Sequence, residues 1–214
     1  RDLRMSRGLG DVYKRQGIVD PKHKDRNIVD LLYFPTGGGK TEAYLGLMAF
    51  VIANRRLRKD VMSLFERDGG VTVILRYTLR LLTTQQRDRI TKMVLAAETI
   101  RRQKPQLFGS EPISIGFWVG GGVTPNKFEE FNDNPDNPYK AKKARNLIYK
   151  QLLTCPFCGT PLREENFDID IPKKSIEIHC SSSNCQFYKY KDDRIALPVF
   201  LVDEEIYAKC PTII

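Results

Sequence analysis

A glycine-rich loop, YFPTGGGKTEAYL, constrains the fold of this chain more than any other stretch. An apolar run at 28–34 leads into it, and apolar residues at helical spacing follow from Lys40. A strand, a tight glycine turn and a helix in this order gather backbone N–H groups and the positive helix N-terminus at one point. Such a point binds phosphate, and bulky side chains would block the approach. The pattern therefore predicts a nucleotide phosphate loop.

Two residues of this loop are the main candidates for catalysis. Lys40 is expected to reach the outer phosphates and Thr41 to ligate magnesium, so ATP and Mg²⁺ are the expected cofactors. Phe34 occupies a position where the general phosphate-loop pattern has glycine. The alternative is an ordinary glycine-rich turn between a strand and a helix. The candidate nucleotide-binding residues are Pro35, Thr36, Gly37, Gly38, Gly39, Lys40, Thr41 and Glu42.

Strand-like and helix-like stretches alternate after the loop. Helical spacing covers 40–56 and 83–102, and apolar, β-branched runs at 71–77, 113–119 and 195–202 are typical of strands. This alternation predicts an α/β fold, a parallel sheet with helices on both faces. One face of the second helix is expected to carry Ile90, Met93, Val94, Ala97 and Ile100.

Four of the five cysteines form two close pairs, in CPFCG and in HCSSSNC. Two such pairs supply four thiolates to one tetrahedral ion, so a structural zinc ribbon is predicted. The alternative is that the cysteines are buried and free. His179 is expected to neighbour the metal, and Cys210 has no sequence partner. The expected ligands are Cys155, Cys158, Cys180 and Cys185.

The segment RYTLRLLTTQQ follows the second expected strand and opens the second helix. Arginines there can pair with phosphates, and hydroxyl groups can donate hydrogen bonds to them. The alternative is that these arginines are solvated side chains at a helix end. In GFWVGGG, after the third strand, glycine amides can also contact phosphate, whereas Trp118 is expected in the core. The candidate nucleic-acid contacts are Arg76, Thr78, Arg80, Thr83, Thr84 and Gln85.

These motifs together resemble those of a known protein family. PTGGGKT resembles motif I of superfamily-two helicases, and RYTLRLLTTQQ resembles their motif Ia. With the CPFCG insert, roughly residues 27–214 resemble a group of large prokaryotic helicases that includes the helicase subunit of DISARM anti-phage systems. The resemblance implies a RecA-like P-loop NTPase domain, ATP hydrolysis, a nucleic-acid substrate, DNA before RNA, and protein partners from the defence system.

The acid that ATP hydrolysis needs is harder to find. LPVFLVDEEIY offers Asp203 and Glu204 after an apolar run, and these are weaker catalytic candidates. The resemblance implies that the Asp-Glu box of this family lies further on, beyond a segment like the terminal CPTII. ATP-dependent helicase activity is then expected of a longer parent protein, since a second RecA-like domain is absent here. The alternative function is a non-catalytic zinc-ribbon module that binds nucleic acid or protein.

Composition shifts divide the chain into five segments. Residues 1–16 resemble translated sequencing adapter, so this end, like the abrupt C-terminus, is expected to be a cut. The first part of the helicase domain is expected at 17–122, a loop and basic helix at 123–152, the zinc ribbon at 153–190, and a return to the truncated helicase domain at 191–214.

Net charge and hydropathy indicate the kind of partner. The formal net charge is +9, and it is +6 without the first segment, which favours a polyanionic partner such as nucleic acid. No apolar run approaches the roughly 20 residues that span a bilayer, and no secretory signal is visible. A cytoplasmic protein without a membrane partner is therefore expected.

Overall fold

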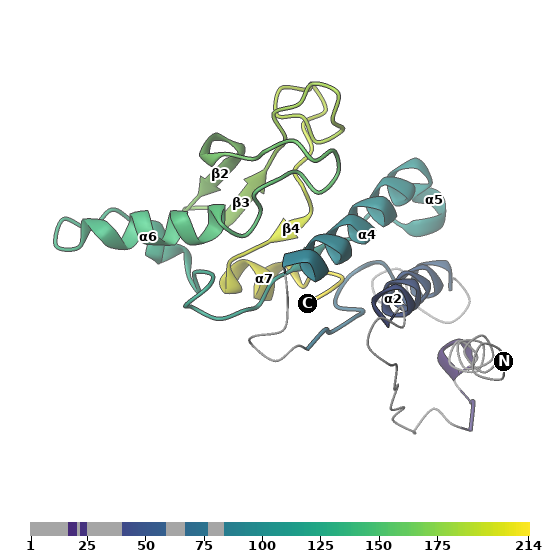
Figure 1. The fold of residues 1–214 in the computed structure, drawn as a ribbon. Helices are drawn as coiled ribbons and strands as arrows, with labels where there is room; N and C mark the ends of the chain where they lie inside the picture. The colour runs from purple at the N-terminus through teal and green to yellow at the C-terminus, as the bar shows by residue number, and fades with distance from the viewer. Residues whose placement is uncertain (1–16, 21, 25–39, 59–66, 77–83) are drawn as a thin grey trace.

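The computed structural model describes residues 17–20, 22–24, 40–58, 67–76 and 84–214 (Figure 1). None of the helices in these ranges is long and apolar enough to cross a membrane. The α-helices are α2 (Lys40–Leu57), α4 (Thr84–Gln103), α5 (Pro105–Phe108), α6 (Pro138–Tyr149) and α7 (Asp203–Lys209). The strands are β1 (Ile115–Gly116), β2 (Phe167–Asp170), β3 (Ser175–Ile178) and β4 (Val199–Phe200), and the 3-10 helices are η1 (Phe128–Phe131) and η2 (Glu164–Asn166).

A small parallel sheet lies at the centre of the fold. β1 pairs in parallel with β4. On the other side of β1, Ile115 is bridged to Ile213, which is bridged in parallel to Val73. The order across the sheet is therefore 71–75, 212–214, β1 and β4. The apolar runs expected to be strands at 71–77, 113–119 and 195–202 supply this sheet, but regular pairing covers only a few residues of each. The first expected strand, 28–34, lies outside the described residues.

Helices pack on both faces of β1. A Cβ atom added at Gly116 would lie 2.9 Å from the Ile206 side chain of α7. The next residue, Phe117, lies under the Arg87 guanidinium of α4, which is 5.8 Å from the centre of its ring. Successive strand residues point to opposite faces, so α7 and α4 cover opposite sides. The predicted α/β layering is confirmed for this small sheet.

Helices α2 and α4 begin and end within a residue of the bounds predicted from periodicity, and they contact each other. The predicted apolar face of α4 was partly wrong, because Ile100 is 50% exposed. The buried face includes Val94 and the ion pair of Glu98 with Arg101, whose Nε lies 2.7 Å from the Glu98 carboxylate. The buried face of α4 therefore includes a charged pair, and it differs from the face that apolar residues alone predict.

The cysteine segment folds around an antiparallel hairpin. β2 pairs with β3, with Phe167 opposite Ile178. Ile178 is fully buried, and its carbonyl accepts a hydrogen bond from the Leu197 N–H at 2.7 Å. The Gln186 amide donates to Thr99 of α4 at 2.6 Å. The hairpin segment is therefore joined both to the chain entering β4 and to α4.

Candidate functional site

Four cysteine sulfur atoms meet in the segment that carries β2 and β3. The Sγ atoms of Cys155, Cys158, Cys180 and Cys185 all lie within 4.8 Å of one another. The Cys155 and Cys185 sulfurs are 3.9 Å apart, and those of Cys158 and Cys180 are 3.5 Å apart. Thiolates around a tetrahedral zinc lie about 3.8 Å apart, whereas disulfide sulfurs lie about 2 Å apart. The spacing therefore fits four ligands of one ion.

Two tight backbone turns hold these thiols in place. In the first, the Cys155 N–H donates to the Thr160 carbonyl at 2.7 Å, and the Gly159 N–H donates to the Cys155 carbonyl at 2.8 Å. Gly159 has a φ of +80°, which glycine adopts without strain. In the second, the Ser182 N–H points at the Cys180 Sγ, 3.4 Å away. Each cysteine pair is thus presented by its own turn, as its spacing predicts.

The protonation of the thiols also fits a cation at their centre. Burial raises the pKa of Cys155 and raises that of Cys185 to about 11, and neighbouring thiolates add to both shifts. Burial also opposes ionisation of Cys158, but hydrogen bonds with Thr160, Cys180 and Cys155 together outweigh it and lower the pKa to about 7. Thiolates this close repel one another, so they ionise together only around a positive ion. The donor set suits Zn²⁺.

His179 lies beside the cluster but outside the ligand set. It is fully buried, its Nδ1 lies 3.1 Å from the Ile195 carbonyl, and its Nε2 accepts a hydrogen bond from Arg194 Nε at 2.9 Å. The Glu177 carboxylate is 3.3 Å from the same Nε2. Both ring nitrogens of His179 therefore have partners other than a metal ion between the four thiols.

The residues expected to hold nucleotide phosphates lie partly beyond the region that the structure describes. α2 begins at Lys40, so Thr41 and Glu42 occupy its first turn. The Glu42 carboxylate accepts a hydrogen bond from Arg89 of α4, which lowers its pKa and ties the start of α2 to α4. Pro35, Thr36, Gly37, Gly38 and Gly39 lie outside the described residues.

The expected nucleic-acid contacts are likewise only partly described. Arg76 is exposed and directly follows Leu75, whose N–H donates to the Ile214 carbonyl at 2.7 Å. It therefore lies at the carboxyl end of its strand. α4 begins at Thr84, and Gln85 is exposed in its first turn. Thr78, Arg80 and Thr83 lie outside the described residues.

Asp203 and Glu204 open α7, and both contact other parts of the fold. Burial raises the pKa of the Asp203 carboxyl group, and the neighbouring Trp118 indole opposes this rise. The Glu204 carboxylate accepts a hydrogen bond from the Phe128 N–H at 3.1 Å and pairs with Lys174. Glu204 thus joins α7 to η1 and to the hairpin turn.

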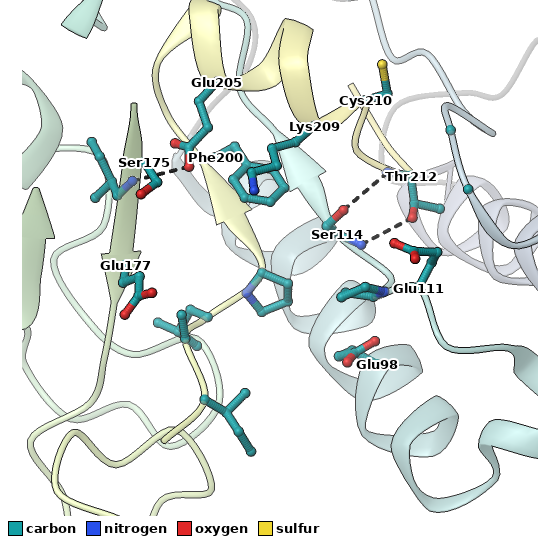
Figure 2. A pocket seen from close by; sticks show the side chains of 18 of the residues that line it. Glu98, Glu111, Ser114, Ser175, Glu177, Phe200, Glu205, Lys209, Cys210 and Thr212 are labelled. Atoms are coloured by element: carbon teal, nitrogen blue, oxygen red, sulfur yellow. Dashed lines mark hydrogen bonds between the residues drawn. The ribbon is translucent and has the colours of Figure 1, made fainter. Parts of the chain in front are cut away.

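A pocket of about 610 Å³ lies where the sheet strands begin (Figure 2). Gly70, Ser114, Pro198 and Thr212, each just before or at the start of its strand, line it. Ligands of parallel sheets bind at the opposite, carboxyl edge. Five carboxylates and two lysines line this pocket, and two of the carboxylates are ion-paired, Asp68 with Arg67 and Glu98 with Arg101. These charged lining residues are Asp68, Glu98, Glu111, Glu177, Glu205, Lys173 and Lys209.

Comparison with known proteins gives one clear similarity. No protein-family model matches the chain. The chain is similar to DISARM protein DrmA. It is 51% identical over 205 residues to the DrmA of Bacillus paralicheniformis, an alignment that covers 93% of this chain. The chain spans 18% of the length of that DrmA.

Two side chains of the site differ in burial from what the sequence motifs indicate. Trp118 was expected in the core but is 55% exposed, because Phe117 takes the buried side of the strand. Glu205 is only 2% exposed, although it sits in the charged run DEEIYAK. Strict alternation of buried and exposed side chains along the strand indicates that Trp118, directly after the buried Phe117, is exposed. No sequence signal separates the buried Glu205 from its acidic neighbours.

Proposed function

We propose that this chain is the ATP-binding part of a nucleic-acid-dependent ATPase of the helicase type, acting in DISARM anti-phage defence. The observation that carries the proposal is 51% identity to DISARM protein DrmA over 93% of the chain. Because the chain spans 18% of that relative, the helicase activity belongs to the longer protein.

In this proposal the 35–41 loop holds the ATP phosphates. The start of α2 at Lys40 supports it, because a helix N-terminus directly after the glycines adds its positive dipole to the site. Lys40 contacts the outer phosphates and Thr41 ligates Mg²⁺. Glu42, held by Arg89, fixes the first turn of α2 against α4.

Nucleic acid lies along the carboxyl edge of the sheet, where Arg76 and the start of α4 supply phosphate contacts. Thr78, Arg80, Thr83, Thr84 and Gln85 complete this contact set. DNA is the expected substrate, and the basic net charge of +9 supports a polyanion. The zinc site holds the ribbon closed and performs no chemistry, since all four of its ligands come from protein thiols.

Asp203 and Glu204 serve the fold rather than magnesium in this proposal. The Glu204 carboxylate already accepts the Phe128 N–H and pairs with Lys174, and the Asp203 side chain is half-buried. The Mg²⁺-binding acid then lies in a part of the longer protein that follows this sheet.

The test is nucleotide binding by the chain itself. A fluorescent ATP analogue with Mg²⁺ is expected to bind the 214-residue chain and to lose at least about tenfold in affinity in Lys40→Ala, because one charged phosphate contact is removed. Lys92→Ala, which removes an exposed lysine of α4, is the matched control and should bind normally. Equal affinity in the wild type and Lys40→Ala would refute the ATP site.

A non-catalytic zinc-ribbon module is the second candidate, favoured by the four-thiol cluster. It requires salt-sensitive DNA binding that ignores ATP and survives Lys40→Ala. In the longer protein, the helicase proposal instead requires ATP turnover that rises when single-stranded DNA is added. Measuring turnover with and without DNA separates the two.

A further inference from the structure

The Trp118 side chain is largely exposed to solvent just after the β1 segment. It is the only tryptophan in the chain, and 55% of it is exposed. Tryptophan is usually well buried, so a half-exposed ring next to a buried Phe117 calls for an explanation. Among the described residues, the other strongly exposed aromatic side chains, Tyr139, Tyr190 and Tyr207, lie outside the central sheet.

The ring lies at the carboxyl edge of the sheet. The Phe117 N–H donates to the Phe200 carbonyl at 3.0 Å, and Trp118 follows directly after this last sheet bond. Arg76 occupies the corresponding position after the 71–75 strand. Carboxyl ends of parallel strands share one edge, so the exposed cation and the exposed ring lie on the same side of the molecule.

The Asp203 side chain, at the start of α7, is an acidic neighbour of the ring, and the indole opposes the rise in the pKa of its carboxyl group that burial causes. The Asp203 Oδ1 is buried and has no hydrogen-bond partner among the described residues. The exposed part of the ring is the part that a ligand can reach.

The loop after the ring leaves room for a ligand. Gly120 has a φ of +85°, and a Cβ atom at Gly120 or Gly122 would meet no atom within 4 Å. Gln151 supports the end of this loop, because its amide donates a hydrogen bond to the Val123 carbonyl at 2.8 Å. Gln151 in turn accepts a hydrogen bond from Arg87 at 2.6 Å. An open glycine loop on a fixed base can bring backbone N–H groups close to phosphate.

We propose that Trp118 is a stacking platform for one base of single-stranded nucleic acid, with Arg76 and the 120–122 loop holding the neighbouring phosphates. This inference rests on the proposed nucleic-acid function and adds the residue that contacts a base. Aromatic rings stack on every base, so the contact is tolerant of sequence and favours single strands over duplexes.

The single tryptophan makes the test direct. Adding oligothymidylate to the 214-residue chain is expected to quench the Trp118 fluorescence, because a stacked base deactivates the excited indole. An oligomer of abasic sites with equal charge should bind more weakly and leave the fluorescence unchanged. Fluorescence anisotropy of labelled oligothymidylate should show affinity falling about 5- to 100-fold in Trp118→Ala, with most of it kept in Trp118→Phe.

Tyr207→Ala removes a ring from α7 that is more exposed than Trp118, at 78% against 55%, and is the matched control, expected to bind as the wild type does. Thermal unfolding of each variant checks that it is folded, and Trp118→Phe keeps the test valid if Trp118→Ala is not. If labelled DNA binds but neither quenching nor loss of affinity in Trp118→Ala occurs, the stacking proposal is overturned and the proposed function stands. If labelled DNA fails to bind even at low salt, the nucleic-acid function fails and the stacking proposal with it.

Discussion

At the scale of single residues, the interior of this protein holds an unusual carboxyl group. Glu205 is 2% exposed, and its carboxylate accepts the Ile176 N–H at 3.2 Å. Its other oxygen, Oε2, has no partner among the described residues. Burial raises the pKa of Glu205 to about 7, since a charge there would be poorly solvated. Near neutral pH the side chain therefore carries a proton part of the time, at the border between α7 and β3 (Figure 2).

This raised pKa predicts how stability depends on pH. The unfolded chain loses the proton near pH 4.5, whereas the folded chain keeps it until about pH 7. Between these values the folded state binds more protons, so the free energy of unfolding falls as pH rises, by up to about 3 kcal/mol. Glu205→Gln removes the ionisation, so thermal unfolding between pH 5 and 8 should show a much flatter profile.

Glu111→Gln is the control for this prediction, because Glu111 lines the same pocket but is exposed. It should keep the pH profile of the wild type. A profile for Glu205→Gln that runs parallel to the wild type would show that the buried carboxyl group does not titrate as described.

At the scale of elements, close packing of α7 on β1 depends on one missing side chain. Gly116 is buried, and a Cβ atom there would lie 2.9 Å from side-chain atoms of both Ile206 and Pro211. Real Cβ contacts are longer, so α7 reaches the sheet only because position 116 is glycine. The same strand pairs with β4 on one side and with 212–214 on the other, so a shift of α7 would disturb the centre of the sheet.

Gly116→Ala is therefore expected to destabilise the protein by about 1–3 kcal/mol through overpacking. For a domain of this size the melting temperature should fall by about 2–4 °C per kcal/mol, measured by calorimetry or circular dichroism. Gly122→Ala is the matched substitution, because a Cβ atom there would meet nothing within 4 Å. Equal melting temperatures for the two variants would contradict the packing argument.

Elements with strong local signals were predictable from the sequence, and the details of their packing were not. The bounds of α2 and α4 follow from apolar periodicity, and the two cysteine pairs predict a four-thiol cluster from spacing alone. The outward side of Ile100 goes with the buried Glu98–Arg101 ion pair on the interior face of α4, and Trp118 is exposed where Phe117 takes the buried side of the strand. Apolar periodicity carries no information about a charged pair on a buried face.

At the scale of the whole molecule, the two edges of the sheet present different groups. The carboxyl edge carries Arg76, the glycine loop after Trp118 and, beyond β4, Asp203 and Glu204, whereas the pocket at the amino edge is lined by five carboxylates and two lysines. Two of those carboxylates, Asp68 and Glu98, are ion-paired with arginines. The thiol cluster belongs to a third region, which bonds to both α4 and the approach to β4.

Removing a metal ion from the four-thiol cluster is therefore expected to destabilise more of the protein than the cysteine segment. Chelation, or Cys155→Ser, should lower the melting temperature by on the order of 10 °C, because metal binding and folding of the segment are coupled. Metal analysis should find about one zinc per chain in the wild type, since four thiolates complete one tetrahedral site. Cys210→Ser, which alters an exposed cysteine outside the cluster, should keep both the metal and the melting temperature. Zinc far below one per chain in the wild type would remove the metal site.

The order of strands in the sheet has a consequence for synthesis on the ribosome. The 212–214 strand lies between 71–75 and β1, yet it is made after both of them. The nascent chain cannot close the middle of its sheet until the cysteine segment has already emerged. That segment needs only neighbours between Cys155 and Cys185 to gather its four sulfurs. Metal binding can thus precede completion of the sheet. Sheet formation is the slow step, because the 212–214 strand is synthesised last and pairs with strands that are distant in sequence.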